Sequence, residues 1–277
     1  MRMIVSRSYL VLGLIAGVMA WPPAEASAQY RPAGPPVVGE EYHLEVGYGF
    51  WNPAPSLIVN SEALGILGTD VNLVEDLGVE KKRVGKLDVV LRPGRKHRFR
   101  FQYIPIHYIV DDHQVSREFI FNGQRFNVGL PVKTDANFET YRFGYEFDFL
   151  QFSRGFIGAL IDVKYTNVDV KLESPIGDEF TTAAAPIPTL GLAARGYVTS
   201  NLALNGEMSF FRVPDNLGEQ IGGDGSYTDF DLNATYNFTK NIGAQAGYRS
   251  VHVFYTVDSD NGSLKFKGLY FGAVVRF

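Results

Sequence analysis

The chain of 277 residues contains no cysteine, and this absence excludes several kinds of site at once. Disulfide bonds, zinc sites built from thiolates and cysteine nucleophiles all need the missing side chain. An excess of basic charge is also lacking: 26 basic residues against 30 acidic residues give a net charge of −4. Nucleic-acid-binding proteins carry a basic surface, so we expect no nucleic-acid partner. The phosphate-binding pattern GxxxxGK[ST] is absent, and we expect no cofactor.

A long apolar run is missing as well. Near the N-terminus, the stretch from Tyr9 to Met19 is shorter than the roughly 20 residues that a membrane-spanning helix needs. Later in the chain, the stretch from Ala183 to Ala194 comes closest, but prolines and a glycine interrupt it. The sequence therefore offers no spanning helix.

The N-terminal stretch has the pattern of a cleaved export signal. Arg2 and Arg7 provide its positive charge, and Ala26-Ser27-Ala28 provides the small residues of a cleavage site. We expect residues 1–28 to be removed as a signal peptide, with cleavage after Ala28. The chain would then carry 24 basic and 29 acidic residues, because Arg2, Arg7 and Glu25 are lost.

Aromatic residues and glycine are abundant: the chain has 21 Phe, 15 Tyr and 29 Gly. They occur in segments where apolar and polar residues alternate, which is the two-residue period of a β-strand. In the last segment, Leu269, Phe271, Val275 and Phe277 lie on one face, whereas Arg276 lies on the other. An apolar outer face with a polar reverse is typical of strands in a membrane-spanning β-barrel.

This last segment resembles the C-terminal signal by which bacterial outer-membrane barrels are recognised for assembly. Residues 40–277 as a whole resemble the small outer-membrane β-barrel families of Gram-negative bacteria, the OmpA/OmpW-like group in the broad sense. The resemblance implies a place in the outer membrane, contact with outer-membrane lipid and lipopolysaccharide, and insertion by the barrel assembly machinery. It implies no particular activity, no cofactor and no named partner for the surface loops.

We predict an all-β protein: a closed, antiparallel, transmembrane β-barrel of about ten strands, although eight or twelve would also fit. Residues 29–40 form a proline-rich lead-in, and residues 41–277 form the barrel. In the first strand, Tyr42 and the residues at every second position after it are expected to face outward. Short connections belong in the periplasm and long ones outside the cell. The segments around 111–137 and 173–186 are among the predicted extracellular connections.

The inward faces of the predicted strands carry equal numbers of acidic and basic residues. A selective pore would show an excess of one sign, whereas a small barrel is just wide enough for side chains to fill it. We therefore expect a network of ion pairs in the lumen, and a narrow passive channel for small or apolar solutes remains the alternative. The network comprises Glu45, Asp88, Arg98, Arg100, Arg142, Glu146, Asp148, Asp162, Lys164, Arg195, Glu207, Asp229, Asp231, Arg249 and Arg276, together with Lys86.

One pair of residues suggests an enzyme. Ser250 and His252 are two apart on an outward face near the outer leaflet. Lipid A deacylases use a His and a Ser on a lipid-facing strand, but in the order His-x-Ser, and no orienting acid is identifiable here. Two residues along a strand are about 7 Å apart at the backbone, which is too far for a serine and its base. The sequence therefore favours a non-enzymatic structural or surface-interaction protein, with a lipid A-modifying enzyme as a second alternative.

Two Asn-Gly pairs are candidate two-residue hairpin turns. A turn at Asn261-Gly262 would place Ser250 opposite Ala273. A turn at Asn122-Gly123 cannot lead into unbroken strands, because inward Arg98 would then oppose outward Phe147. We expect an odd number of β-bulges in that hairpin, at Pro105 first and at Asp111-Asp112 second.

A polar segment near residue 75 has two interpretations. Its oxygen ligands, from Asp70, Asn72, Glu75 and Asp76, could hold a hard divalent cation. The same residues fit a short helix with Asn72 as N-cap, Glu75 in a capping box and Gly78 at its end. We prefer the helix, and a cation bound beside it remains the alternative.

Overall fold

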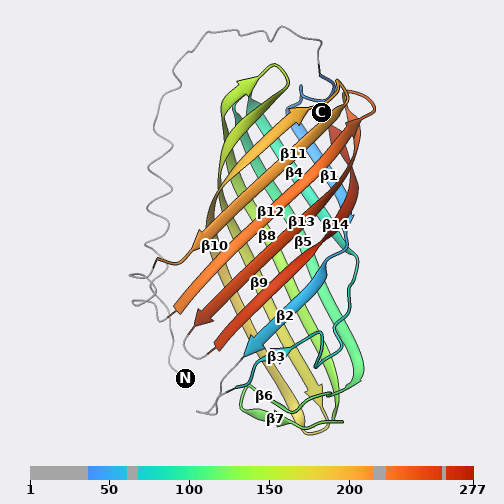
Figure 1. Ribbon diagram of the computed structural model, residues 1–277, viewed down its shortest axis with the longest axis vertical. Helices are drawn as coiled ribbons and strands as arrows, with labels where there is room; N and C mark the ends of the chain where they lie inside the picture. Colours follow the sequence, from blue (N-terminus) through green and yellow to red (C-terminus); the bar gives the residue numbers. More distant parts are fainter. Residues whose placement is uncertain (1–36, 61–67, 215–222, 258–259) are drawn as a thin grey trace. The chain divides into compact units, whose positions relative to one another are not determined.

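The computed structural model describes residues 37–60, 68–214, 223–257 and 260–277 (Figure 1). The predicted signal peptide, residues 1–28, and most of the proline-rich lead-in lie outside the described residues. Secondary structure in the described part consists of strands and turns, and it includes no helix with the length and hydropathy needed to cross a membrane.

Ten strands form the predicted closed antiparallel barrel, in which consecutive strands pair and β1 closes the ring against β14. The ten are β1 (Leu44–Trp51), β4 (Val84–Gly94), β5 (His97–Gln114), β8 (Pro131–Phe152), β9 (Gly155–Ser174), β10 (Gly177–Tyr197), β11 (Leu202–Arg212), β12 (Gly223–Asn237), β13 (Ile242–Val257) and β14 (Asp260–Arg276). Four short strands accompany them. The first, β2 (Ala54–Asn60), follows β1 along the far half of β14, and β3 (Val71–Asn72) pairs with β2. The other two, β6 (Phe119–Phe121) and β7 (Gln124–Phe126), form a hairpin of their own.

A belt of exposed apolar side chains surrounds one half of the barrel. Phe143, Ile161, Leu192, Leu232 and Phe271 come from five different strands, and each is between 46% and 57% exposed. Water would not stabilise such a surface, whereas the hydrocarbon of a bilayer would. This half therefore spans the membrane, and its strand faces agree with the alternation in the sequence.

The C-terminal residues Leu269, Phe271, Val275 and Phe277 all lie on the exposed face of the belt. Their recognition by an assembly machinery stays a prediction. The outward placement of Tyr42 is wrong, because this residue precedes β1 and is only 7% exposed. Its ring lies at the periplasmic mouth, where the guanidinium carbons of Arg92 and Arg276 are 5.5 and 5.7 Å from the ring centre.

Three strands continue far beyond the belt on the extracellular side. The membrane needs about 9–11 residues of a tilted strand. In this barrel β8 has 22 residues, β9 has 20 and β10 has 21. The predicted extracellular loop at 173–186 is therefore wrong: Ser174 pairs with Gly177, and both strands continue from there. We call this part of the barrel the extracellular extension (Figure 1, bottom).

The two faces of a strand exchange their chemistry where the extension begins. On β8 the outward residues change from Phe143 and Tyr141 to Glu139 and Asn137, while the inward residues change from Arg142 to buried Phe138. The strand keeps its register, so only the residue types are exchanged. The spanning half is apolar outside and charged inside, whereas the extension is polar outside and apolar inside, as in a water-soluble barrel. The sequence analysis missed this inversion, although the residues show it.

The hairpin around Asn122-Gly123 has the predicted turn and the predicted odd bulge. Phe121 pairs with Gln124 across the two-residue turn. Between this turn and the membrane, the register of β5 against β8 shifts once, between Val110 and His113. The bulge is at Asp111-Asp112, where Asp112 has a φ of +53°. The prediction of a bulge at Pro105, the first of the two sites, is wrong, because Pro105 pairs in register with Glu139. The pairing of β4 with β5 ends at Tyr103, so Pro105 lies on a free edge where a missing N–H is tolerated.

The predicted turn at Asn261-Gly262 is wrong. Both residues lie within β14, and Gly262 pairs with Tyr255 of β13. The Tyr255 ring occupies the space that a side chain at position 262 would need, which explains the glycine there. Ser250 consequently opposes Lys267 instead of Ala273. The observed partner of Ser250 is six positions before the predicted one along β14. Because six is an even number, every side chain stays on its predicted face.

Candidate functional site

Ion pairs fill the lumen of the spanning half. The structure places all fifteen charged residues of the predicted network, and Lys86, on inward faces. Each of them lies within 4.0 Å of an opposite charge inside the barrel. Burying so many charges is costly unless each is paired, and here the pairing is complete.

Asp229 of β12 is the anion at the centre of one cluster. Its carboxylate accepts hydrogen bonds from Lys164 Nζ at 2.7 Å and from Arg249 Nη2 at 2.7 Å and Nε at 3.1 Å. Lys164 also donates to Ser209 Oγ at 2.7 Å, and Arg249 donates to Gln102 Oε1 at 2.6 Å. All of these side chains are buried, so five strands are joined through one carboxylate.

A second cluster crosses the lumen from β5 and β8 to β11. Glu146 pairs with Arg98 at 2.8 Å and with Arg100. Glu207, on the facing wall, pairs with Arg100 at 2.7 Å and with Arg142. Between the clusters a cavity of about 100 Å³ remains, lined by Arg100, Arg142, Glu207 and neighbouring residues. This space suits a few water molecules held by polar groups.

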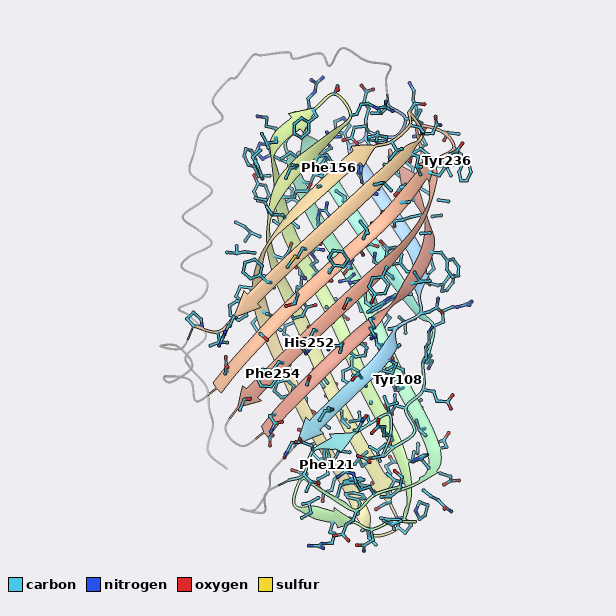
Figure 2. The ribbon with its side chains drawn as sticks, viewed as in Figure 1. Tyr108, Phe121, Phe156, Tyr236, His252 and Phe254 are labelled. Atoms are coloured by element: carbon cyan, nitrogen blue, oxygen red, sulfur yellow. The ribbon has the colours of Figure 1, made fainter. Side chains whose placement is uncertain are left out.

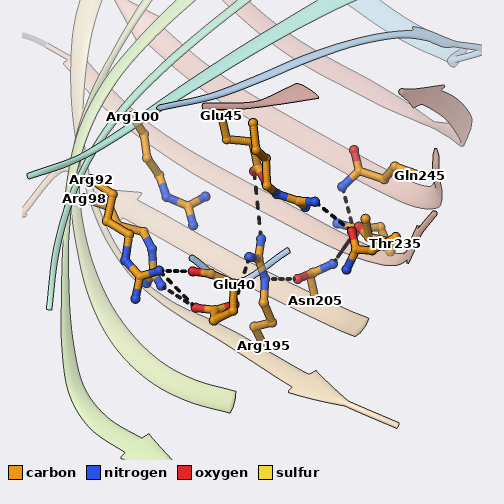
Figure 3. A network of polar contacts seen from close by, with 12 residues as sticks. Glu40, Glu45, Arg92, Arg98, Arg100, Arg195, Asn205, Thr235 and Gln245 are labelled. Atoms are coloured by element: carbon orange, nitrogen blue, oxygen red, sulfur yellow. Dashed lines mark hydrogen bonds and ion pairs between the residues drawn. The ribbon is translucent and has the colours of Figure 1, made fainter. Parts of the chain in front are cut away.

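Glu40 closes the periplasmic mouth of the lumen. Its carboxylate lies 3.3 Å from Arg98 Nη2, 3.3 Å from Arg92 Nη1 and 3.4 Å from Arg195 Nη1 (Figure 3). It also accepts a hydrogen bond from the Tyr197 hydroxyl at 3.0 Å. The sequence analysis missed this residue because it precedes the first alternating segment and was assigned to the lead-in.

The chain before Glu40 is also attached to the mouth. Val38 N donates to Ser200 O at 2.8 Å, and Asn237 Nδ2 donates to Val38 O at 2.6 Å. Arg276 lies directly against Gly39, whose φ of +82° suits a glycine. Residues 38–42 therefore run across the mouth as a strap, held by contacts to the connection between β10 and β11, to the end of β12 and to the end of β14.

The interior of the extension is an apolar core. Phe138 is 2% exposed and packs edge-on against Tyr108 and Phe266, with ring centres 6.4 and 5.4 Å apart. Around these rings, the core contains Leu57, Val59, Ile104, Ile106, Val168, Val170, Leu172, Tyr227, Val251, Val253 and Leu264. Burial raises the pKa of the Tyr108 hydroxyl, which therefore stays neutral. The charged network meets this core at its membrane end, where Lys164 Nζ lies 4.6 Å from the ring centre of Tyr227.

The β6–β7 hairpin covers the extracellular end of that core. Its own residues Phe119, Phe121 and Phe126 are buried, and the rings of Phe119 and Phe126 stack with centres 5.0 Å apart. Figure 2 shows Phe121 at this end of the barrel. Thr69 holds the hairpin from the side: its N donates to Ile120 O, and its hydroxyl accepts from Ile120 N, both at 2.9 Å. Together the hairpin and the neighbouring segment form a lid on the barrel.

The segment beside the hairpin forms one capped turn where a short helix was predicted. Asn72 Oδ1 accepts from Val74 N at 3.1 Å and from Glu75 N at 3.4 Å, as an N-cap does. The reciprocal carboxylate is Asp76, which accepts from Asn72 N at 2.9 Å, so the assignment of that role to Glu75 is wrong. Asp76 also binds Arg117 at 2.7 Å, which leaves it committed to a protein cation. Among the described residues, no group of three or more acidic or histidine side chains is arranged to hold a metal.

A groove lies on the outer, water-facing side of the extension. It has a volume of about 490 Å³ and is lined by His107, Asp135, Asn137, Glu139, Asp169, Val170, Lys171, Phe180, Thr181 and Thr182. His107 Nε2 lies 2.7 Å from Asp135 Oδ1, and the Phe180 ring is 67% exposed at one end. Lys171 is engaged by Glu173 at 2.5 Å, and its hydrogen bond, with the charge of Lys133, lowers the pKa of the Glu173 carboxyl. The carboxylates of Asp135, Glu139 and Asp169 make the groove acidic.

Ser250 and His252 both lie on the outward face of β13, as predicted, but they do not form a dyad. His252 Nε2 lies 3.4 Å from Ser263 Oγ, at the long limit of a hydrogen bond. Ser250 opposes Lys267. No hydrogen bond between Ser250 and His252 is present in the described part of the chain, so this geometry does not activate a serine for acyl transfer.

Comparison with known proteins supports the fold. No protein-family model matches the sequence, and a search of curated proteins found no match. Among solved structures, the outer membrane protease OmpT from Escherichia coli matches with a TM-score of 0.56 and 9% identity, over 84% of this chain and 96% of that one. Ail, the attachment invasion locus protein of Yersinia pestis, matches with a TM-score of 0.35 and 10% identity, over 86% and 99%. The Pseudomonas putida toluene transporter TodX matches with a TM-score of 0.34 and 8% identity, over 85% and 90%. The chain thus has the fold of the bacterial outer-membrane barrels, and its apolar belt places it in that membrane.

Proposed function

We propose that this protein is a non-enzymatic outer-membrane barrel that acts at the cell surface through its extracellular extension. One observation carries the proposal: the interior is filled along its length. The strap at Glu40, the ion-pair clusters, the apolar core and the β6–β7 lid follow one another from the periplasmic to the extracellular end.

A passive channel would need a different interior. Selective pores keep charges of one sign exposed to water, whereas here the charges of both signs are paired and most are buried. Apolar solutes would meet the charged half, and ions would meet the apolar core. The cavity of about 100 Å³ lies between clusters and gives room for water only.

Conductance in a planar bilayer tests the sealed interior. The refolded full-length barrel should show no stable conductance steps in the nanosiemens range, because both ends and both halves of the lumen are closed. A general porin inserted into the same bilayer serves as the positive control. Stable steps from the purified protein would replace this proposal with the channel.

The groove on the extension is the best candidate for a recognition surface. Its carboxylates, from Asp135, Glu139 and Asp169, lie above the stacked rings of Tyr103 and Tyr141, whose centres are 4.7 Å apart. Paired aromatic rings of this kind mark the membrane–water boundary of barrels. Just outside that boundary, an acidic groove with the exposed ring of Phe180 fits a basic peptide segment that also carries apolar side chains.

A basic peptide probe tests this assignment. We expect the protein, in nanodiscs of zwitterionic lipid, to bind a fluorescent hexalysine peptide. The variant Asp135→Asn/Glu139→Gln/Asp169→Asn should bind it roughly tenfold more weakly, because exposed ion pairs contribute up to about 1 kcal/mol each. Lys265→Gln/Lys267→Gln, on another face, is the control and should leave the affinity unchanged. Equal binding by wild type and the triple variant would exclude the groove as the site.

A further inference from the structure

Five basic side chains gather on the outer surface at the extracellular edge of the apolar belt. They are Lys81, Lys82 and Arg83, immediately before β4, and Lys265 and Lys267 on β14; all five are exposed. We call them the basic rim patch. They come from parts of the sequence that lie about 180 residues apart, and no motif joins them.

Strand pairing brings the two groups together. Lys267 pairs with Ala54 and Lys265 with Ser56, both on β2, which lies beside β14 (Figure 1). Arg83 lies on the other side of the segment that leads from β1 into β2, where its Nε donates to Asn52 Oδ1 at 3.3 Å. One strand therefore separates Arg83 from the two lysines of β14, which corresponds to roughly 10 Å between the flanking backbones. That intervening strand presents small, uncharged side chains outward between them.

Arg83 has a fixed position at the edge of the belt. Its guanidinium carbon lies 6.0 Å from the ring centre of Phe50 and 5.6 Å from that of Phe271. Both rings belong to the lipid-facing surface. On β14, Lys267 directly follows the lipid-facing positions 271 and 269 on the same face, two residues further out. The patch therefore lies at the level of the lipid headgroups of the outer leaflet.

The five cations have no carboxylate partner among the described residues. Lys82 Nζ donates to the carbonyl oxygen of His107 at 3.0 Å, a neutral acceptor. The contrast with the opposite outer face is clear, because there Lys133 and Lys171 both pair with Glu173. The nearest acidic residue in the sequence, Glu80, is outnumbered five to one. A cluster of unpaired cations at headgroup level favours an anionic ligand in the membrane plane.

We propose that the basic rim patch binds the phosphate groups of lipid A, the anionic glycolipid of the outer leaflet. Lys265, Lys267 and Lys81 are the free ammonium groups for the phosphate oxygens, and Arg83 is held by the two rings at the base of the patch. The acyl chains of the same lipid lie against Leu269, Phe271 and Phe50 directly below. This site is separate from the sealed lumen, and it adjoins the groove where Lys82 donates to the carbonyl oxygen of His107.

Two matched double variants test the site. Each removes two exposed lysines from the full-length barrel in detergent: Lys265→Gln/Lys267→Gln from the patch, and Lys133→Gln/Lys171→Gln from the opposite face. Binding of diphosphorylated lipid A, measured by microscale thermophoresis, should weaken about 25-fold in the first variant, since each lysine near an anionic surface contributes about a factor of five. The second variant should bind like the wild type.

Two further probes identify the ligand chemistry. Dephosphorylated lipid A should bind wild type and both variants equally weakly, because only the acyl chains then make contact. A soluble heparin oligosaccharide should compete for the same cations, but only at concentrations well above that of lipid A, because it lacks those chains. Unchanged lipid A affinity in Lys265→Gln/Lys267→Gln would overturn the proposal. Equal affinity for the two forms of lipid A, or no competition by heparin at any concentration, would overturn it as well.

Discussion

Replacing Asp229 by asparagine is expected to lower the free energy of unfolding by about 3–5 kcal/mol, because it leaves two buried cations without their anion. Lys164 and Arg249 both bind this carboxylate, and both are buried. Asparagine has nearly the same shape, so the loss measures charge rather than packing. Urea unfolding in lipid vesicles, followed by the fluorescence of Trp51, gives the value. The indole lies 5.8 Å from the Arg249 guanidinium carbon and so reports on the same cluster.

The matched control is Glu173→Gln on the extension. Glu173 also binds two cations, Lys133 and Lys171, but both pairs are exposed to water. Exposed pairs contribute little, so this variant should unfold at nearly the same urea concentration as the wild type. Similar small losses in both variants would show that water reaches Asp229, and the lumen would then be open.

Replacing Phe138 by alanine should cost about 3–5 kcal/mol, the usual range for removing a buried phenylalanine. The ring lies between Tyr108 and Phe266, so its removal leaves a cavity at the centre of the extension's core. The same unfolding experiment measures the loss. Because the lid rests on this core, we also expect faster protease cleavage of the β6–β7 hairpin on intact cells.

Phe180→Ala provides the comparison for Phe138. Phe180 belongs to the same extension but is 67% exposed, so its removal should change the unfolding free energy by less than about 0.5 kcal/mol. If Phe138→Ala were equally mild, the apolar core would not contribute to the stability of the barrel. The extension would then fold independently of the interior packing described above.

Asp229→Asn and Phe138→Ala probe the two halves of one barrel, in which the inward and outward placement of charged and apolar residues is reversed. Within the membrane the surroundings are apolar, so the charged residues are inside and paired. In the extension the surroundings are water, so the charged residues are outside and the apolar residues form the core. On β9, for example, the outward residues change from Ile161 and Tyr165 to Asp169 and Lys171, while inward Lys164 is followed by Val168 and Val170. The position of this exchange marks the outer surface of the membrane.

The sequence by itself determined the barrel, a strand number of about ten and the direction of nearly every side chain. Period-two alternation is a local property, and a membrane-spanning strand shows it on both faces, so neighbouring residues were enough. The same alternation identified the charged lumen residues, and the equal numbers of both signs indicated ion pairs. The odd number of bulges in the β5–β8 hairpin followed from parity alone, because inward and outward residues cannot oppose each other in a sheet, whereas the structure placed the bulge at Asp111-Asp112, the second of the two predicted sites.

Only the tertiary structure decided which residues meet. Local sequence cannot distinguish registers that differ by an even number of residues, which is why the Asn261-Gly262 turn was misplaced while the strand faces were right. Glu40 precedes the alternating segments, and its place in the mouth depends on arginines from three distant strands. The basic rim patch likewise exists only because β2 lies between β14 and the residues before β4. Contacts between distant segments depend on strand pairing around the closed ring, which no local pattern in the sequence records.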